Sequence, residues 1–314
     1  MSDIKLFKYH SSGVTELEGK AAVVERDLQQ LIESNMEAFL GVRFLATEYN
    51  TGKTHRGRID SLGLDENGCP VIIEYKRHTN ENVINQGLFY LDWLLDHQAE
   101  FQLLVMKTLG NEAAESIEWE GTRLLCIAGD FTKYDEHAVQ QINRNIELLR
   151  YKLFADDLLM LELVNVVAVS GQSVKSQIGL TGTDAAFAKP KSSSVMKTHL
   201  EQLELASVSL KQLYDGVIDY TASLGDDVHY KQLKLYGAFR RLKNFVCIIV
   251  LPKQDPKLQL LVRLDPKTVD MEEGFSRDVS EIGHWGTGDL ELTIRTSDDL
   301  EKAKPLIKRA AEEN

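Results

Sequence analysis

The sequence predicts an α/β fold in two domains, and three features support this prediction. Short β-branched runs alternate with helical segments through residues 20–170. Residues 171–195 (GQSVKSQIGLTGTDAAFAKPKSSSV) are rich in small residues and lack periodicity, which is typical of a linker. Residues 196–314 then contain helical and strand patterns of their own. We therefore expect a first domain over 1–170, a linker over 171–195 and a smaller α+β domain over 196–314.

The composition indicates a soluble globular protein. The 314 residues are 43% hydrophobic and 27% charged. No apolar run approaches the roughly 18 residues that span a bilayer, and the N-terminus lacks the apolar core of a signal peptide. The three cysteines lie far apart, without the spacing of a zinc site or a disulfide framework. We expect a cytoplasmic protein with no membrane association.

The net charge of −12 argues against tight, non-specific binding to nucleic acid, because such binding depends on neutralising phosphates. Local basic patches matter more than the total charge, so the balance does not exclude a nucleic-acid partner.

Residues 25–40 predict the first helix. The apolar residues Val24, Leu28, Ile32, Met36 and Phe39 form one stripe. At about 100° per residue, Glu25 lies on that stripe, where a carboxylate needs a hydrogen bond, a cation or a metal. Alternatively, Glu25 simply lies at the helix N-terminus, where a negative charge is favourable. Both interpretations stay open.

A strand is predicted over 44–49, followed by a hairpin that carries the most informative residues. One strand opens at residues 57–60, Asn67-Gly68 lies in a turn over 65–68, and the second strand returns over 71–76. Alternation places Ile72, Glu74 and Lys76 on one face, and Asp60 lies across the hairpin. Two carboxylates and a lysine that converge at a strand end predict a divalent-metal site with an ammonium beside it.

This pattern resembles the PD-(D/E)xK nuclease superfamily. Asp60, then Glu74-x-Lys76, then Gln86-x-x-x-Tyr90 occur in strand-turn-strand-helix order, most similar to the branch of RecB-type nucleases and archaeal mismatch or branched-DNA endonucleases. The resemblance covers roughly residues 20–170. Ile59 stands where the superfamily name has a proline. The resemblance implies a restriction-endonuclease-like fold, in which helices flank a mixed sheet. It also implies an enzyme that hydrolyses DNA phosphodiesters with Mg²⁺ or Mn²⁺.

The resemblance also implies roles for individual residues. Asp60, Glu74 and the backbone carbonyl of Tyr75 would hold the metal. Lys76 would lie against the attacking water or a phosphate oxygen. Gln86 and Tyr90 would orient the site, although alone they would be ordinary packing residues. Superfamily members often carry a further acidic residue on the first helix, and Glu25 is the candidate here.

Further elements follow in the order expected for such a core. We expect a helix over 82–109 that breaks near Ala99-Glu100, a strand over 124–128, a helix over 135–151 and an apolar strand over 158–169. In the second domain we expect a helix over 198–220, strands over 245–251, 258–264 and 290–295, and a last helix over 298–311 capped by Thr296 or Ser297.

Two groups of basic residues are candidates for contacts with nucleic acid. Before the hairpin these are Lys53, Arg56 and Arg58, which otherwise form a solvated loop. In the second domain, basic residues lie among Tyr236 and Phe239, in what is otherwise a solvated turn before a buried strand. This second group consists of Lys231, Lys234, Arg240 and Arg241.

The sequence therefore predicts a metal-dependent DNA nuclease of repair or defence, with DNA as the partner and a homodimer as one option for its assembly. The alternative is a non-catalytic module on a nuclease fold that binds nucleic acid or protein. The second domain resembles a small α+β domain of unassigned function that follows such cores. Proteins of this architecture have been loosely labelled predicted transport proteins, but no membrane segment here supports transport.

Overall fold

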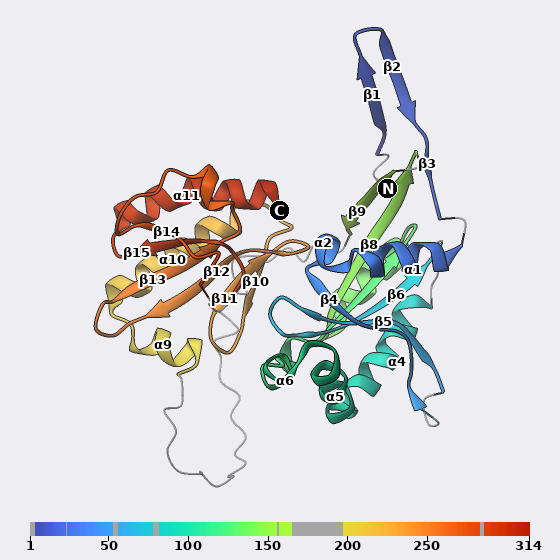
Figure 1. Ribbon diagram of the computed structural model, residues 1–314, viewed down its shortest axis with the longest axis horizontal. Helices are drawn as coiled ribbons and strands as arrows, with labels where there is room; N and C mark the ends of the chain where they lie inside the picture. Colours follow the sequence, from blue (N-terminus) through green and yellow to red (C-terminus); the bar gives the residue numbers. More distant parts are fainter. Residues whose placement is uncertain are drawn as a thin grey trace. The chain divides into compact units, whose positions relative to one another are not determined.

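The computed structural model describes residues 4–22, 24–52, 56–77, 82–155, 157–164, 197–282 and 286–314. The chain divides into two compact units, Met1–Val166 and Val167–Asn314. The segment 171–195, expected to be a linker, lies outside the described residues, as does Lys53. Figure 1 shows both units. No helix within the described ranges is both long and apolar enough to cross a bilayer.

Unit 1 is built on a mixed sheet with the order β3-β8-β7-β6-β5-β4, and β9 pairs with β8. Strands β4, β5 and β6 form an antiparallel meander, whereas β6, β7 and β8 run parallel. The strands are β3 Gly19–Lys20, β4 Val42–Asn50, β5 Arg58–Asp65, β6 Pro70–Lys76, β7 Arg123–Ala128, β8 Asn145–Phe154 and β9 Leu158–Leu163. The fold class of this unit, a mixed α/β sheet flanked by helices, is confirmed.

The predicted hairpin is present between β5 and β6. Gly68 has φ +74, and its N–H donates to the carbonyl of Asp65 at 3.0 Å. Glycine suits this position because a left-handed backbone costs it no steric clash. The turn sets the register in which Leu62 faces Ile72 and Ser61 faces Ile73, and this register brings Asp60 beside Glu74.

The helices of unit 1 flank this sheet, and α4 packs on β6 and β7. They are α1 Glu25–Ser34, α2 Met36–Leu40, α4 Val83–Asp96, α5 Gln98–Leu109, α6 Asn111–Glu115, the 3₁₀ turn Trp119–Gly121 and α7 Lys133–Gln141. The predicted long helix over 82–109 is interrupted at His97, two residues before the expected break. The predicted helix over 25–40 is interrupted at Asn35, which adopts a non-helical conformation.

The predicted helix over 135–151 is wrong. A capping box between Thr132 and Asp135 starts α7, but this helix ends at Gln141, and β8 begins at Asn145. Apolar spacing of three and four residues across this boundary imitates one helical face. In the structure, residues 145–150 instead pair with β7 in a parallel ladder that completes the buried sheet. Tertiary pairing overrides the local pattern here.

One further strand of unit 1 differs from expectation. The strand expected over 158–169 is observed as β9, a half-exposed strand beside β8 rather than one buried on both faces, and residues 165–169 lie outside the described part. The N-terminal segment forms the hairpin β1 Leu6–His10 and β2 Gly13–Leu17. This hairpin projects away from the main sheet in Figure 1.

Unit 2 is an α+β unit with an antiparallel sheet of order β10-β11-β12-β13-β15-β14. Its elements are α9 His199–Leu205, α10 Val208–Ala222, β10 His229–Gln232, β11 Gly237–Arg240, β12 Asn244–Leu251, β13 Lys257–Val262, the 3₁₀ turn Pro266–Thr268, β14 Ser276–Asp278, β15 Leu290–Ile294 and α11 Ser297–Glu313. The three strands and the last helix predicted here are confirmed, and Thr296 caps that helix. The predicted helix over 198–220 divides before Ser207, whose hydroxyl caps α10.

Candidate active site

The two strands of the hairpin separate at Asp60 and Glu74. Their register is continuous from Leu64 opposite Pro70 to Ser61 opposite Ile73 and stops there. Beyond that point the Asp60 N–H donates to Glu74 Oε1 at 3.2 Å, and the Tyr75 N–H donates to Asp60 Oδ2 at 3.0 Å. We call this opening, formed by Asp60, Glu74 and Tyr75, the fork. Each carboxylate takes a main-chain N–H of the opposite strand.

Burial makes the fork electrostatically unfavourable without a cation. Glu74 has no exposed surface, and its Oε2 has no hydrogen-bond partner in the described part of the chain. Burial, followed by the charge of Asp60, raises the pKa of Glu74 to about 9. Burial also raises the pKa of Asp60, against the opposing effects of the Tyr75 N–H and of Lys76. The pair therefore resists carrying two negative charges at neutral pH.

Lys76 and Glu25 meet at the open end of the fork. The Lys76 ammonium lies 3.3 Å from Glu25 Oε1, and the Arg77 N–H donates to Glu25 Oε2 at 3.1 Å. Glu25 is the first residue of α1, and 42% of its side chain is exposed. The expected burial of Glu25 is therefore only partial. Glu25 lies at the helix N-terminus and also contacts a cation, Lys76, so the structure contains features of both interpretations of this residue.

Gln86 and Tyr90 lie on α4, and Tyr90 contacts the start of β5. The Tyr90 hydroxyl accepts hydrogen bonds from the Arg58 N–H at 3.3 Å and from Gln86 Nε2 at 3.4 Å. A Cβ on Gly57 would come within 2.4 Å of the Tyr90 ring, so only glycine allows this approach. Tyr90 therefore fixes the main chain two residues before Asp60, and Gln86 supports Tyr90.

The oxygen donors at the fork fit a magnesium or manganese ion. Within the described ranges there is no group of three or more His, Cys, Asp or Glu side chains that could hold a metal. Mg²⁺ does not need one, because it commonly uses one or two carboxylates and keeps several waters. Asp60 and Glu74 supply two carboxylates, and Glu74 Oε2 is buried without a partner. The Tyr75 carbonyl stays a predicted third donor.

The two basic groups differ in how the structure uses them. Arg56 and Arg58 are exposed at the start of β5, and Arg58 pairs with Glu48 at 3.2 Å. In unit 2, Lys231 lies in β10 and Lys234 in the connection to β11. Arg240 is 6% exposed and donates to the carbonyls of Arg241 and Leu242.

Arg241 pairs with Asp227 at 2.9 Å and donates to the carbonyl of Ala311. The stretch expected to be a solvated turn is therefore largely strand, and Arg240 and Arg241 serve the fold. Their assignment as contacts for nucleic acid stays a prediction.

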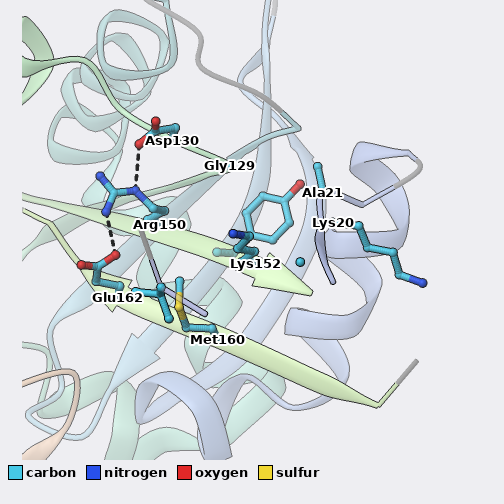
Figure 2. Close-up of a pocket in the computed structure, with 11 residues that line it drawn as sticks. Lys20, Ala21, Gly129, Asp130, Arg150, Lys152, Met160 and Glu162 are labelled. Atoms are coloured by element: carbon cyan, nitrogen blue, oxygen red, sulfur yellow. Dashed lines mark hydrogen bonds and ion pairs between the residues drawn. The ribbon is translucent and has the colours of Figure 1, made fainter. Parts of the chain in front are cut away.

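Figure 2 shows a pocket of about 360 Å³ in unit 1, which the sequence did not predict. It lies beyond the carboxyl end of β7, and residues of β3, β8 and β9 line its other sides. Arg150 pairs there with Asp130 at 2.8 Å and with Glu162 at 2.6 Å. These ion pairs occupy the guanidinium from both sides, which indicates a structural role.

Both units of the chain are similar to known proteins. A family model described as a domain of unknown function (DUF5655) matches residues 199–314. A protein of Haemophilus influenzae, described as uncharacterized, is 27% identical over 317 residues, which cover 98% of this chain and 99% of that protein.

Two solved structures resemble part of the chain. A repair endonuclease from Pyrococcus abyssi has a TM-score of 0.28 and 19% identity, covering 44% of this chain and 51% of that one. A structure of an EndoMS–dsDNA complex has a TM-score of 0.25 and 20% identity, covering 44% and 50%. The chain thus spans about half the length of these structures, and likeness at these scores carries no functional argument.

Proposed function

We propose that unit 1 is a divalent-metal-dependent nuclease that hydrolyses DNA phosphodiesters. The observation that supports this proposal is the fork, where Asp60 and Glu74 replace ladder hydrogen bonds and Glu74 Oε2 is left without a partner. A buried, unpaired carboxylate oxygen is costly unless a cation joins it. The motif Asp60…Glu74-x-Lys76, on adjacent strands, supports the proposal, because such a cation would lie where the resemblance implies catalysis.

The residues around the fork have complementary roles in this proposal. Asp60 and Glu74 would hold Mg²⁺ or Mn²⁺, which when bound lowers the pKa of a water ligand and offsets charge on the phosphate. Lys76 would present its ammonium to the scissile phosphate or the attacking water, and Glu25 orients it through their ion pair. Tyr90 and Gln86 would keep the start of β5, and hence Asp60, in place.

A second candidate is a non-catalytic module that binds nucleic acid or protein. Two observations count against DNA as the partner and so favour the protein-binding form of this module: the net charge of −12, and the contacts of Arg240 and Arg241 inside unit 2. A module of this kind has no need of a metal at the fork. Metal binding and cleavage therefore separate the two candidates.

The test is cleavage of labelled single-stranded, duplex, mismatched and flapped DNA, with an RNA duplex alongside, in Mg²⁺ or Mn²⁺. Lys76→Ala and Asp60→Ala should abolish cleavage while the fold is kept. Lys107→Ala, which removes an exposed lysine of α5, is the matched control and should cut like the wild type. Wild-type cleavage by Lys76→Ala, or no Mn²⁺ binding by calorimetry together with no cleavage, contradicts the nuclease and supports the module.

A further inference from the structure

A buried polar network supports the fork from α1. Gln29 of this helix is 8% exposed, and its amide nitrogen contacts three acceptors in three elements. These are Glu33 Oε1 at 3.0 Å, Thr47 Oγ1 at 3.1 Å and the main-chain carbonyl of Asp60 at 2.8 Å. The contact with Asp60 is the shortest of the three. Gln29 therefore joins α1 and β4 directly to the residue at the fork.

The orientation of the Gln29 amide follows from its partners. The carbonyl of Asp60 can only accept, and Glu33 Oε1 already accepts from the Ser61 hydroxyl at 2.6 Å. The atom that faces both must therefore be the amide nitrogen. The Ser61 hydroxyl in turn lies 3.1 Å from the Tyr75 hydroxyl, so the network contacts a residue on each strand of the fork: the Asp60 main chain and the Tyr75 side chain.

The main chain opposite Asp60 is irregular. Thr47 pairs with Ser61 and Tyr49 pairs with Ile59, and Glu48 between them has φ +48, which a residue with a side chain rarely adopts. On the other side the ladder with β6 has already ended. Asp60 therefore lies where the sheet is distorted on one side and open on the other. Gln29 of the neighbouring helix α1 supplies a hydrogen bond to Asp60 at this irregular point of the sheet.

We propose that Gln29 is a positioning residue for the fork. By holding the Asp60 carbonyl, it fixes the residue whose N–H donates to Glu74 Oε1 and whose carboxylate accepts from the Tyr75 N–H. Gln29 acts through Asp60 and touches neither metal nor substrate. This inference rests on the proposed function for its effect on metal binding, but it also has a consequence in the metal-free protein.

The test compares Gln29→Met, which keeps the length of the side chain and removes the donor, with Thr47→Val. The second variant removes another partner of Gln29 and leaves the bond to Asp60 in place. In metal-free protein, amide hydrogen exchange of Asp60 and Tyr75 should accelerate about tenfold in Gln29→Met, as expected for the loss of one hydrogen bond. Exchange at Ile73, where the ladder is intact, and at all three sites in Thr47→Val should match the wild type.

Mn²⁺ calorimetry is the second measurement. Gln29→Met should bind about 10- to 100-fold more weakly, the effect usual for residues that orient metal ligands, and Thr47→Val should bind like the wild type. If Gln29→Met does not fold, Gln29→Asn, whose amide is too short to reach, replaces it. Unchanged exchange at both amides overturns the assignment, whatever the affinity. If exchange accelerates in Gln29→Met but the wild type binds no Mn²⁺, Gln29 is still a positioning residue for the fork, and the proposal of a metal-dependent nuclease is rejected.

Discussion

Glu74→Gln tests the chemistry of the fork through folding stability, without any substrate. The replacement keeps the shape of the side chain and removes its charge. A glutamine carbonyl can still accept from the Asp60 N–H, and the new amide can donate to the Asp60 carboxylate across the fork. We expect the metal-free variant to be more stable than the wild type at neutral pH and unable to hold the ion.

The expected magnitude follows from the pKa of Glu74, which burial and Asp60 raise from 4.5 to about 9. The unfolded chain is ionised at pH 7, so folding must take up a proton there. At pH 7 this proton uptake lowers the free energy of unfolding of the wild type by about 3 kcal/mol, because pH 7 lies about 2.5 above the pKa of Glu74 in the unfolded chain. At pH 5 the loss is below about 1 kcal/mol. Because the folded-state pKa is the higher one, the wild type loses stability as pH rises from 4.5 towards 9.

Urea unfolding of both proteins at pH 5, 7 and 8.5, with and without Mn²⁺, measures this effect. Without metal, the advantage of Glu74→Gln should grow with pH, and Mn²⁺ should stabilise the wild type only. Glu120→Gln, which neutralises an exposed carboxylate of the same unit, is the control and should behave like the wild type. Equal stability of the two proteins at pH 8.5, or equal stabilisation by Mn²⁺, would refute the reasoning.

Three further predictions concern other parts of the chain. His199 is buried in unit 2 and its pKa is lowered to about 4, so unit 2 should lose about 3 kcal/mol as pH falls from 6.5 to 4. Urea midpoints at pH 7 and 4.5 should show a smaller loss in His199→Gln. Arg123→Met removes a 2% exposed guanidinium from its two carboxylate partners, Asp65 and Glu147, and should destabilise unit 1 by about 3–5 kcal/mol in urea unfolding. Gly57→Ala should displace the Tyr90 ring and slow cleavage, and adding Tyr90→Phe should slow it little further if both act through one contact.

The hairpin at the centre of unit 1 could be predicted because its signals are local. The Asn67-Gly68 turn sets the register, and strict alternation then places Asp60 and Glu74 on one face. The divisions of the helices at Asn35 and Ser207 have local signals too. Both residues favour positions at helix ends over helix interiors, and in the structure Ser207 caps α10.

The misassigned segment over 135–151 shows the limit of periodicity. Val139, Ile142, Ile146 and Leu149 are spaced like one helical face, yet the last two belong to β8. Only the parallel partner β7 distinguishes the two structures, and pairing between distant strands leaves no local signal. Gln29 was missed for a different reason. It lies beside Leu28 on the packed side of α1, and a polar residue there requires a partner, but the identity of that partner depends on the fold.

The fork itself discriminates between the two candidate functions. A module that only binds has no use for an arrangement in which one carboxylate pKa rises to about 9 and one oxygen lacks a partner. Replacing Glu74 by an uncharged residue would stabilise such a module at no functional cost. A metal-dependent site instead requires this arrangement, because a bound ion would offset both causes of the raised pKa of Glu74, first its burial and then the charge of Asp60. Stability gained by Glu74→Gln together with loss of Mn²⁺ binding would therefore mark the fork as selected for an ion rather than for folding.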